Sequence, residues 1–149
     1  MSSQQIASER CAWRFSSVFL GCSDADYQVA ARYLQASHIR LLRAASLEEA
    51  DLLLADGDCR VLLAEATFPG GTWQDAMALK RTRHPEAVLV VTAELADEGV
   101  WLDVLEQGAY DLILKPFVAD ELLRILANAD ACARMRASVR KVRHSGFGW

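Results

Sequence analysis

Val61-Leu62-Leu63-Ala64-Glu65 is a run of four apolar residues closed by a carboxylate, and it sets the architecture of this 149-residue chain. Two later runs have the same form. Val90-Val91 leads to the hydroxyl of Thr92, and Leu112-Ile113-Leu114 leads to the amine of Lys115. Short apolar runs without alternation are typical of strands buried on both faces of a parallel sheet. Strand carboxyl ends share one edge of such a sheet, where ligands bind, so we expect the three polar groups to converge there.

The rest of the chain alternates similar strands with amphipathic helices. Strands are expected at residues 17–20, 39–42, 60–65, 87–91 and 110–114. Helices are expected to follow Ser23, Ser46 and Thr72, to begin near Ala96, and to span 120–140. Ser46 and Glu49 form a predicted capping box, in which each side chain accepts a hydrogen bond from the other residue's amide. Five strand–helix alternations predict an α/β fold, a doubly wound parallel sheet of five strands with helices on both faces.

The composition excludes several function classes. No apolar run approaches the roughly 18 residues that span a bilayer, and the first ten residues lack an apolar signal core. We therefore expect a cytoplasmic protein without a membrane segment. The four cysteines are scattered and form no CxxC pair, so neither a disulfide nor a zinc site is expected. No GxSxG elbow or Walker loop is present, and the chain is not expected to be an enzyme.

The charge of the chain is uneven. From Asp130 onward five cations face one anion, a net charge of +4 in a chain whose net charge is −4. A basic tail on an acidic body can mark a nucleic-acid or partner contact. Cations are also favoured at the carboxyl end of a helix by its dipole, and we favour this second explanation.

At this level the chain resembles the receiver domains of bacterial two-component response regulators. Beyond the three runs above, the segments that carry the resemblance are Phe68-Pro69-Gly70, His84-Pro85, Thr92-Ala93, Gln107-Gly108-Ala109-Tyr110-Asp111 and Lys115-Pro116-Phe117. Each is weak alone, but they occur together, in order and at family-like spacing. The resemblance implies a flavodoxin-like fold with strand order 2-1-3-4-5 and a site phosphorylated on an aspartate by a histidine kinase with the help of magnesium.

The resemblance also assigns positions in this sequence. Glu65 falls on the phosphoacceptor, with Pro69 four residues later fixing the register. Thr92 falls on the hydroxyl and Lys115 on the lysine of the phosphoryl pocket, and the bond from Lys115 to Pro116 is expected to be cis.

The positions that differ from the family pattern say more about function than the positions that match it. The family ends its first strand with two acidic residues that hold magnesium, and here Gly21 and Cys22 occupy that place. Neither suits a hard divalent cation, so we expect no tightly bound magnesium and no other cofactor. Asp24 is a weak metal candidate, better explained as charge in the first turn of a helix. Cys22 could act as a redox thiol, but a small residue that fills the space of the lost acid is the favoured explanation.

The conformational switch of the family is also altered. Leu112 stands where the family has an aromatic residue three positions before the lysine, so no aromatic can rotate there. Tyr110 lies nearby and is expected to point to the opposite side of the strand. Trp101 lies on the predicted fourth helix, which belongs to the face that the family uses for partners.

These observations predict a degenerate receiver that signals by protein contact. The partner is a histidine kinase, an output domain or a second copy, with a homodimer through the fourth helix, fifth strand and fifth helix as one form. Glu65 either neutralises Lys115 or also mimics a phosphorylated aspartate. A receiver that is still phosphorylated, and a nucleic-acid-binding module that uses the basic tail, are the alternatives. The expected division is an extension over 1–14, a receiver-like domain over 15–128 and a basic helical tail over 129–149.

Overall fold

The computed structural model describes residues 13–56, 58–94 and 98–146, without the side chains of 98 and 143–146. Five parallel strands form one sheet: β1 (Phe15–Leu20), β2 (Ile39–Ala44), β3 (Cys59–Glu65), β6 (Val88–Ala93) and β7 (Asp111–Leu114). Their order is β2-β1-β3-β6-β7, which confirms the predicted order 2-1-3-4-5. A two-stranded antiparallel ribbon of β4 (Thr67–Phe68) and β5 (Gly71–Thr72) follows β3 and was not predicted.

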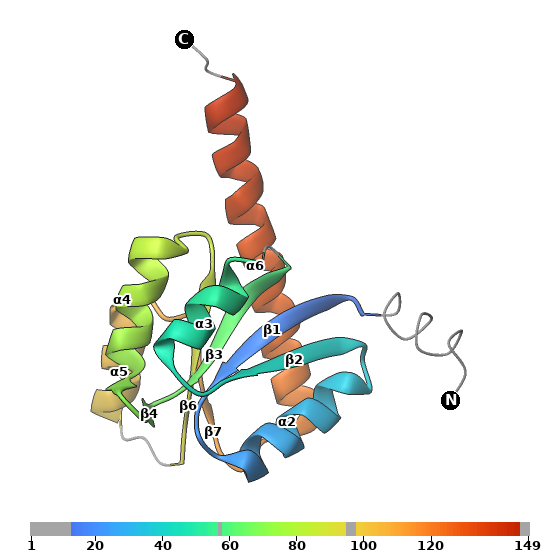
Figure 1. The fold of residues 1–149 in the computed structure, drawn as a ribbon, viewed down its shortest axis with the longest axis vertical. Coiled ribbons are helices and arrows are strands. Elements are labelled where there is room, and N and C mark those ends of the chain that lie inside the picture. The colour runs from blue at the N-terminus through green and yellow to red at the C-terminus, as the bar shows by residue number, and fades with distance from the viewer. Residues whose placement is uncertain (1–12, 57, 95–97, 147–149) are drawn as a thin grey trace.

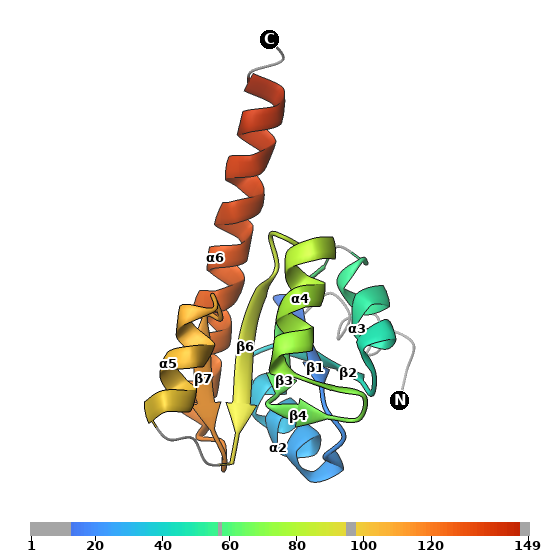
Figure 2. The ribbon, with the colours of Figure 1, turned by 90° about the vertical axis from the view of Figure 1, so that its left-hand side faces the viewer.

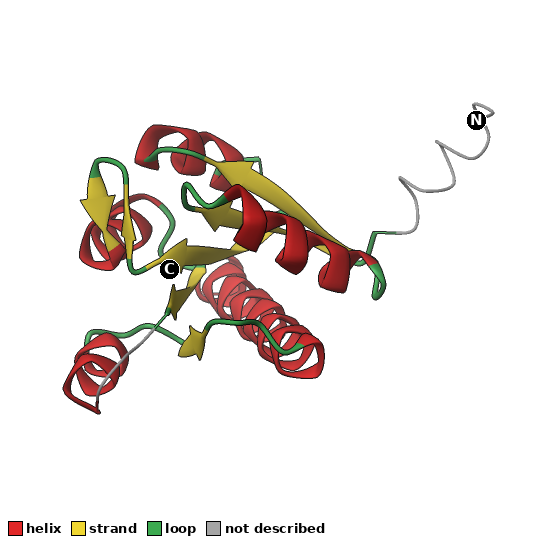
Figure 3. Cartoon of the chain, turned by 90° about the horizontal axis from the view of Figure 1, so that it is seen from below, coloured by secondary structure: helices red, strands yellow, loops and turns green. Residues whose placement is uncertain are grey.

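Helices cover both faces of the sheet (Figures 1 and 3). They are α2 (Asp24–Gln35), α3 (Leu47–Leu54), α4 (Trp73–Arg83), α5 (Glu98–Glu106) and α6 (Ala119–Gly146). Alternate residues of each strand divide the core into two clusters. One cluster packs against α2 and α6 around Phe19 and Leu63, and the other against α3, α4 and α5 around Leu62 and Leu89.

Helix starts follow the local sequence signals, with one correction. Ser23 and Ser46 cap α2 and α3 through their side-chain oxygens, which accept from Asp26 and Glu49 amides. The reciprocal half of the Ser46 box is absent, because Glu49 accepts from the amide of Ala45, one residue earlier than expected. The full capping box stands instead at the start of α4. The predicted starting point of α5, near Ala96, lies outside the described residues.

The last helix is the longest element, and it runs well beyond the sheet (Figure 2). Its packing against the body continues past residue 128, since Ala129 and Ala133 are fully buried in the core beside α2. From Arg134 onward, almost every described side chain is exposed. The receiver-like body therefore uses the helix to about residue 133, and the exposed part begins after it.

Candidate functional site

Three polar residues meet at the carboxyl edge of the sheet, as predicted. Glu65 ends β3 and is paired in register with Thr92 of β6, and Ala93 is paired with the last residue of β7. Lys115 follows directly after β7, and its peptide bond to Pro116 is cis. Strand geometry alone thus brings the carboxylate, the hydroxyl and the amine to one place.

Lys115 binds two carboxylates. Its Nζ lies 2.7 Å from Oε2 of Glu65 and 2.7 Å from Oδ2 of Asp26. The Glu65 and Lys115 side chains are each 10% exposed, so the predicted ion pair between them is present and largely shielded from water. Burial would lower the pKa of Lys115, but the hydrogen bonds and charges of Asp26 and Glu65 outweigh burial and raise the pKa above its ordinary value of 10.5. The lysine is therefore protonated at neutral pH.

The second oxygen of Glu65 is also engaged, and the side chain occupies a space that a larger residue at position 21 would need. Oε1 accepts a hydrogen bond from the amide of Ser23 at 3.2 Å. A Cβ atom on Gly21 would lie 1.9 Å from Oε1 and 2.6 Å from Cγ of Glu65. Only glycine fits here while Glu65 keeps this position. The glutamate at the end of β3 therefore fills the space that an acidic side chain after β1 would need, so the two departures from the family pattern depend on each other.

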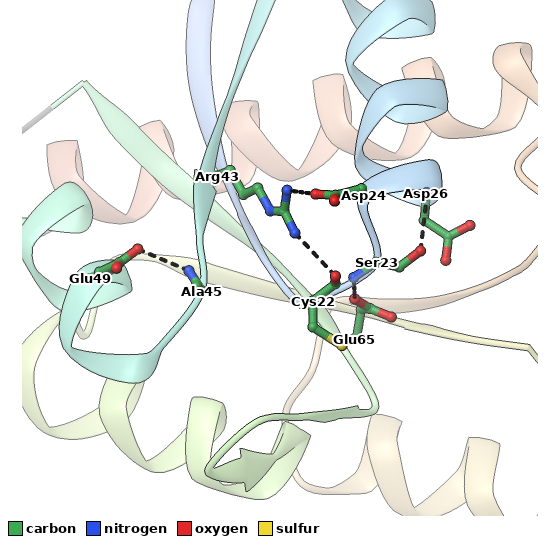
Figure 4. A network of polar contacts seen from close by, with 8 residues as sticks. All are labelled: Cys22, Ser23, Asp24, Asp26, Arg43, Ala45, Glu49 and Glu65. Carbon is green, nitrogen blue, oxygen red and sulfur yellow. Dashed lines mark hydrogen bonds and ion pairs between the residues drawn. The ribbon is translucent and has the colours of Figure 1, made fainter.

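Asp24 does not belong to this site. It forms an ion pair with Arg43 of β2, whose guanidinium also donates to the carbonyl of Cys22 at 3.1 Å (Figure 4). Asp26 is the acidic residue that reaches Lys115, and the sequence reasoning missed it. The available signal was the position of Asp26 in the first turn of the helix that follows β1, where a carboxylate points toward the same edge of the sheet.

The residues at this edge do not fit a magnesium ion. Magnesium requires several hard oxygen ligands in an octahedral arrangement. Position 21 offers no side chain, and both Glu65 oxygens already bind the protein. Within the part of the chain that the structure describes, no three His, Cys, Asp or Glu side chains gather in a way that could hold a metal.

An open pocket nevertheless remains beside these groups. It has a volume of about 470 Å³ and is lined by Glu65, Thr92, Lys115 and the residues that follow the two strands. The hydroxyl of Thr92 is fully buried and has no hydrogen-bond partner within the described residues. Glu65 therefore binds Lys115 but does not bind the hydroxyl of Thr92.

Cys22 is exposed beside this edge, whereas Cys59 is buried at the start of β3. Burial raises the pKa of Cys59 to about 11, so this thiol is unreactive at neutral pH. The backbone carbonyl of Cys22 accepts a hydrogen bond from Arg43.

The face formed by α5 and β7 carries exposed apolar residues. Trp101 is 44% exposed and Tyr110 37%, with Leu105 and Val118 also exposed. Leu112 is buried in the core cluster that faces α3, α4 and α5. Tyr110 was expected to point away from Leu112 by strand alternation, but that reasoning was wrong, because positions 110 and 112 have the same parity. Tyr110 also precedes β7, so strand alternation does not determine its direction.

Comparisons with known proteins agree with this fold. No protein-family model matches the chain. The hydrogenase transcriptional regulatory protein HoxA of Cupriavidus necator is 35% identical over 91 residues, covering 60% of this chain and 19% of that protein. The chemotaxis protein CheY of Listeria monocytogenes is 29% identical over 69 residues, covering 46% of this chain and 58% of that protein. The chain thus matches less than two thirds of the length of either relative.

Two solved structures share the fold. The signal receiver domain of a Luxo repressor protein from Vibrio parahaemolyticus has a TM-score of 0.75 at 13% identity, covering 85% of this chain and 97% of that one. The beryllofluoride-activated NtrC4 receiver domain dimer has a TM-score of 0.68 at 16% identity, covering 81% and 98%. Sheet order and these likenesses show that the chain has the fold of response regulator receiver domains.

The described part of the chain contains no helix long and apolar enough to cross a membrane.

Proposed function

We propose that this receiver domain signals by contact with other proteins and does not depend on magnesium-assisted phosphorylation of an aspartate. The observation that carries the proposal is the closed network around Lys115. Its ammonium group binds Glu65 and Asp26 at 2.7 Å each, and Glu65 also accepts from Ser23. An incoming phosphoryl group would have to displace these contacts.

The altered acceptor adds a geometric argument. Phosphoryl transfer relies on positioning and on neutralising the charge of the transferred group. Glutamate places its carboxylate one methylene further from the backbone than aspartate does, and an error of about 1 Å in such a site is costly. Here that methylene lies where a side chain on Gly21 would otherwise be. The acceptor and the metal site are therefore impaired together, and neutralisation of Lys115 is the role that we assign to Glu65.

A second candidate is a receiver that is still phosphorylated through an altered site. The pocket of about 470 Å³ and the unpartnered hydroxyl of Thr92 favour it, since both are features that a phosphoryl group would use. We rank this candidate lower because the metal ligands that would neutralise the group are lacking at Gly21 and Cys22.

Intact mass after incubation with magnesium and acetyl phosphate separates the two candidates. We expect no phosphate adduct on the native chain, and none on Glu65→Asp while Gly21 and Cys22 remain. A native adduct that disappears in Glu65→Ala would overturn the proposal and make the second candidate correct.

For the partner surface we propose the face of α5, β7 and α6. Trp101, Leu105, Tyr110, Leu114 and Val118 are all more than a third exposed there. Large patches of exposed apolar residues are rare on monomeric proteins, and they mark sites of protein contact. The beryllofluoride-activated NtrC4 receiver domain is a dimer, and we propose a homodimer through this face as one assembly of this chain. A kinase or an output domain is the other class of partner.

The basic tail is less suited to binding nucleic acid than its composition indicates. Arg134 is paired with Asp130 at 2.8 Å, and Arg140 with Glu86 at 2.6 Å. Part of the charge of the basic tail is thus neutralised within the chain. We propose instead that α6 serves as a rigid connection toward an output domain. The proposal is supported by the match to a fraction of a longer transcriptional regulator.

A further inference from the structure

A second polar site lies at the amino-terminal edge of the sheet, opposite the edge that carries Lys115. Four arginines from four segments meet there: Arg14 before β1, Arg40 of β2, Arg60 of β3 and Arg134 of α6. They line a cavity of about 310 Å³, a volume at the lower end of small-molecule sites.

The fold brings these arginines together by two local features. Arg40 lies opposite Ser16 in the β1–β2 register, and its Nε donates to the Ser16 hydroxyl at 3.0 Å. Arg60 is the extra residue of a bulge, because Ser16 is paired with Cys59 and Ser17 with Val61. A bulge changes the direction of a side chain relative to regular alternation.

The protein neutralises only part of this charge. Arg134 binds Asp130, which is itself buried. Arg60 makes no hydrogen bond or ion pair within residues 13–56, 58–94 and 98–146, and the guanidinium of Arg14 lies over the Phe15 ring at 6.0 Å. Among the described residues, Asp58 is the one acidic residue that lines the cavity. The buried Asp130 also attracts Arg14 and Arg60, so two carboxylates face four guanidinium groups. The remaining positive charge favours an external anion, and the planar donors of the arginines match phosphate oxygens.

Two further residues that line the cavity indicate which class of anion would bind there. Trp13 also lines the cavity, and a base can stack on an aromatic side chain. Asp58 can accept hydrogen bonds from ribose hydroxyls or a base amino group. We propose that this cavity binds a nucleotide, with its phosphates on the arginines and its base against Trp13. The proposal is independent of the phosphoryl pocket and of the function proposed above.

The test is calorimetric titration of the full chain with ADP, pyrophosphate and adenosine. We expect ADP to bind more tightly than pyrophosphate and adenosine. Arg60→Ala should weaken ADP binding about tenfold, since a charged hydrogen bond is lost. Trp13→Leu should bring the affinity for ADP down to that for pyrophosphate.

Two controls make the result specific. Arg124 is exposed in the early part of α6, toward the other edge of the sheet, and Arg124→Ala should bind ADP as the native chain does. Glu65→Ala should also leave ADP binding unchanged. The proposal is overturned if the native chain binds no ADP at millimolar concentration, or if Arg124→Ala weakens binding as much as Arg60→Ala. Binding of a short single-stranded oligonucleotide that ADP fails to displace would overturn it as well.

Discussion

At the residue scale, Lys115 is the group on which the candidate site depends. Replacing it by methionine leaves the Glu65 and Asp26 carboxylates together without a cation. Breaking a largely buried ion pair costs about 3 kcal/mol of unfolding free energy, which urea denaturation measures. Asp26→Asn should cost about 1 kcal/mol or less, because the Asp26 side chain is 29% exposed. Equal stability of Lys115→Met and the native chain would contradict this account.

The pH dependence of this contribution has a definite sign. Because the pKa of Lys115 is raised in the folded chain, its stabilising effect is complete below the ordinary value of 10.5 and is lost as the pH rises through the raised value. The stability difference between the native chain and Lys115→Met should therefore be constant around neutral pH and shrink only in alkaline solution.

A second residue-scale prediction concerns Gly21. A methyl group there collides with Glu65, so Gly21→Ala must break the contacts of Glu65 with Ser23 or Lys115. We expect a loss of about 1–2 kcal/mol in the native background. In a Glu65→Ala background the same substitution should cost almost nothing, since the collision is gone. A double-mutant cycle measures this coupling, and additive effects would show that the two positions are independent.

At the scale of elements, α6 belongs to the body further along its length than the resemblance indicated. A chain that ends after residue 128 loses Ala129 and Ala133 from the core. We expect its thermal unfolding midpoint to fall clearly, because about 2 kcal/mol of stabilising free energy from apolar burial is removed. A chain that ends after residue 138 keeps both residues and should melt close to the full chain. Equal midpoints of the two truncations would contradict the packing described here.

The elements also show what the sequence could and could not predict. The convergence of Glu65, Thr92 and Lys115 was predictable, because apolar runs ending in polar residues indicate parallel strands with a shared carboxyl edge. The strand order was expected only from the resemblance to receiver domains. The role of Asp26 was missed, since it depends on how the first turn of α2 is placed relative to Lys115. The contact between Gly21 and Glu65 is a matter of packing between two strands. The arginine cavity draws on four distant segments and a bulge, none of which leaves a local pattern.

At the scale of the whole molecule, the exposed face of α5 and β7 predicts self-association. Leu105→Glu places a charge in the apolar surface and should make the chain monomeric in sedimentation at concentrations where the native chain dimerises. Leu52 on α3 is 74% exposed outside this face, and Leu52→Glu is the matched control that should behave as the native chain does. A native chain that stays monomeric at all concentrations, or a control that also dissociates, would refute this interface.

The central claim is that the edge of the sheet around Glu65 cannot hold magnesium, because Glu65 occupies the space at Gly21 and is held by Lys115. Calorimetric titration with magnesium of the native chain, beside a Gly21→Asp/Cys22→Asp/Glu65→Asp variant, tests it most directly. We predict no binding by the native chain at millimolar magnesium and a measurable site in the variant, where acidic ligands replace the glycine and the thiol. Native binding of magnesium that is lost in Asp26→Asn or Glu65→Ala would contradict the claim.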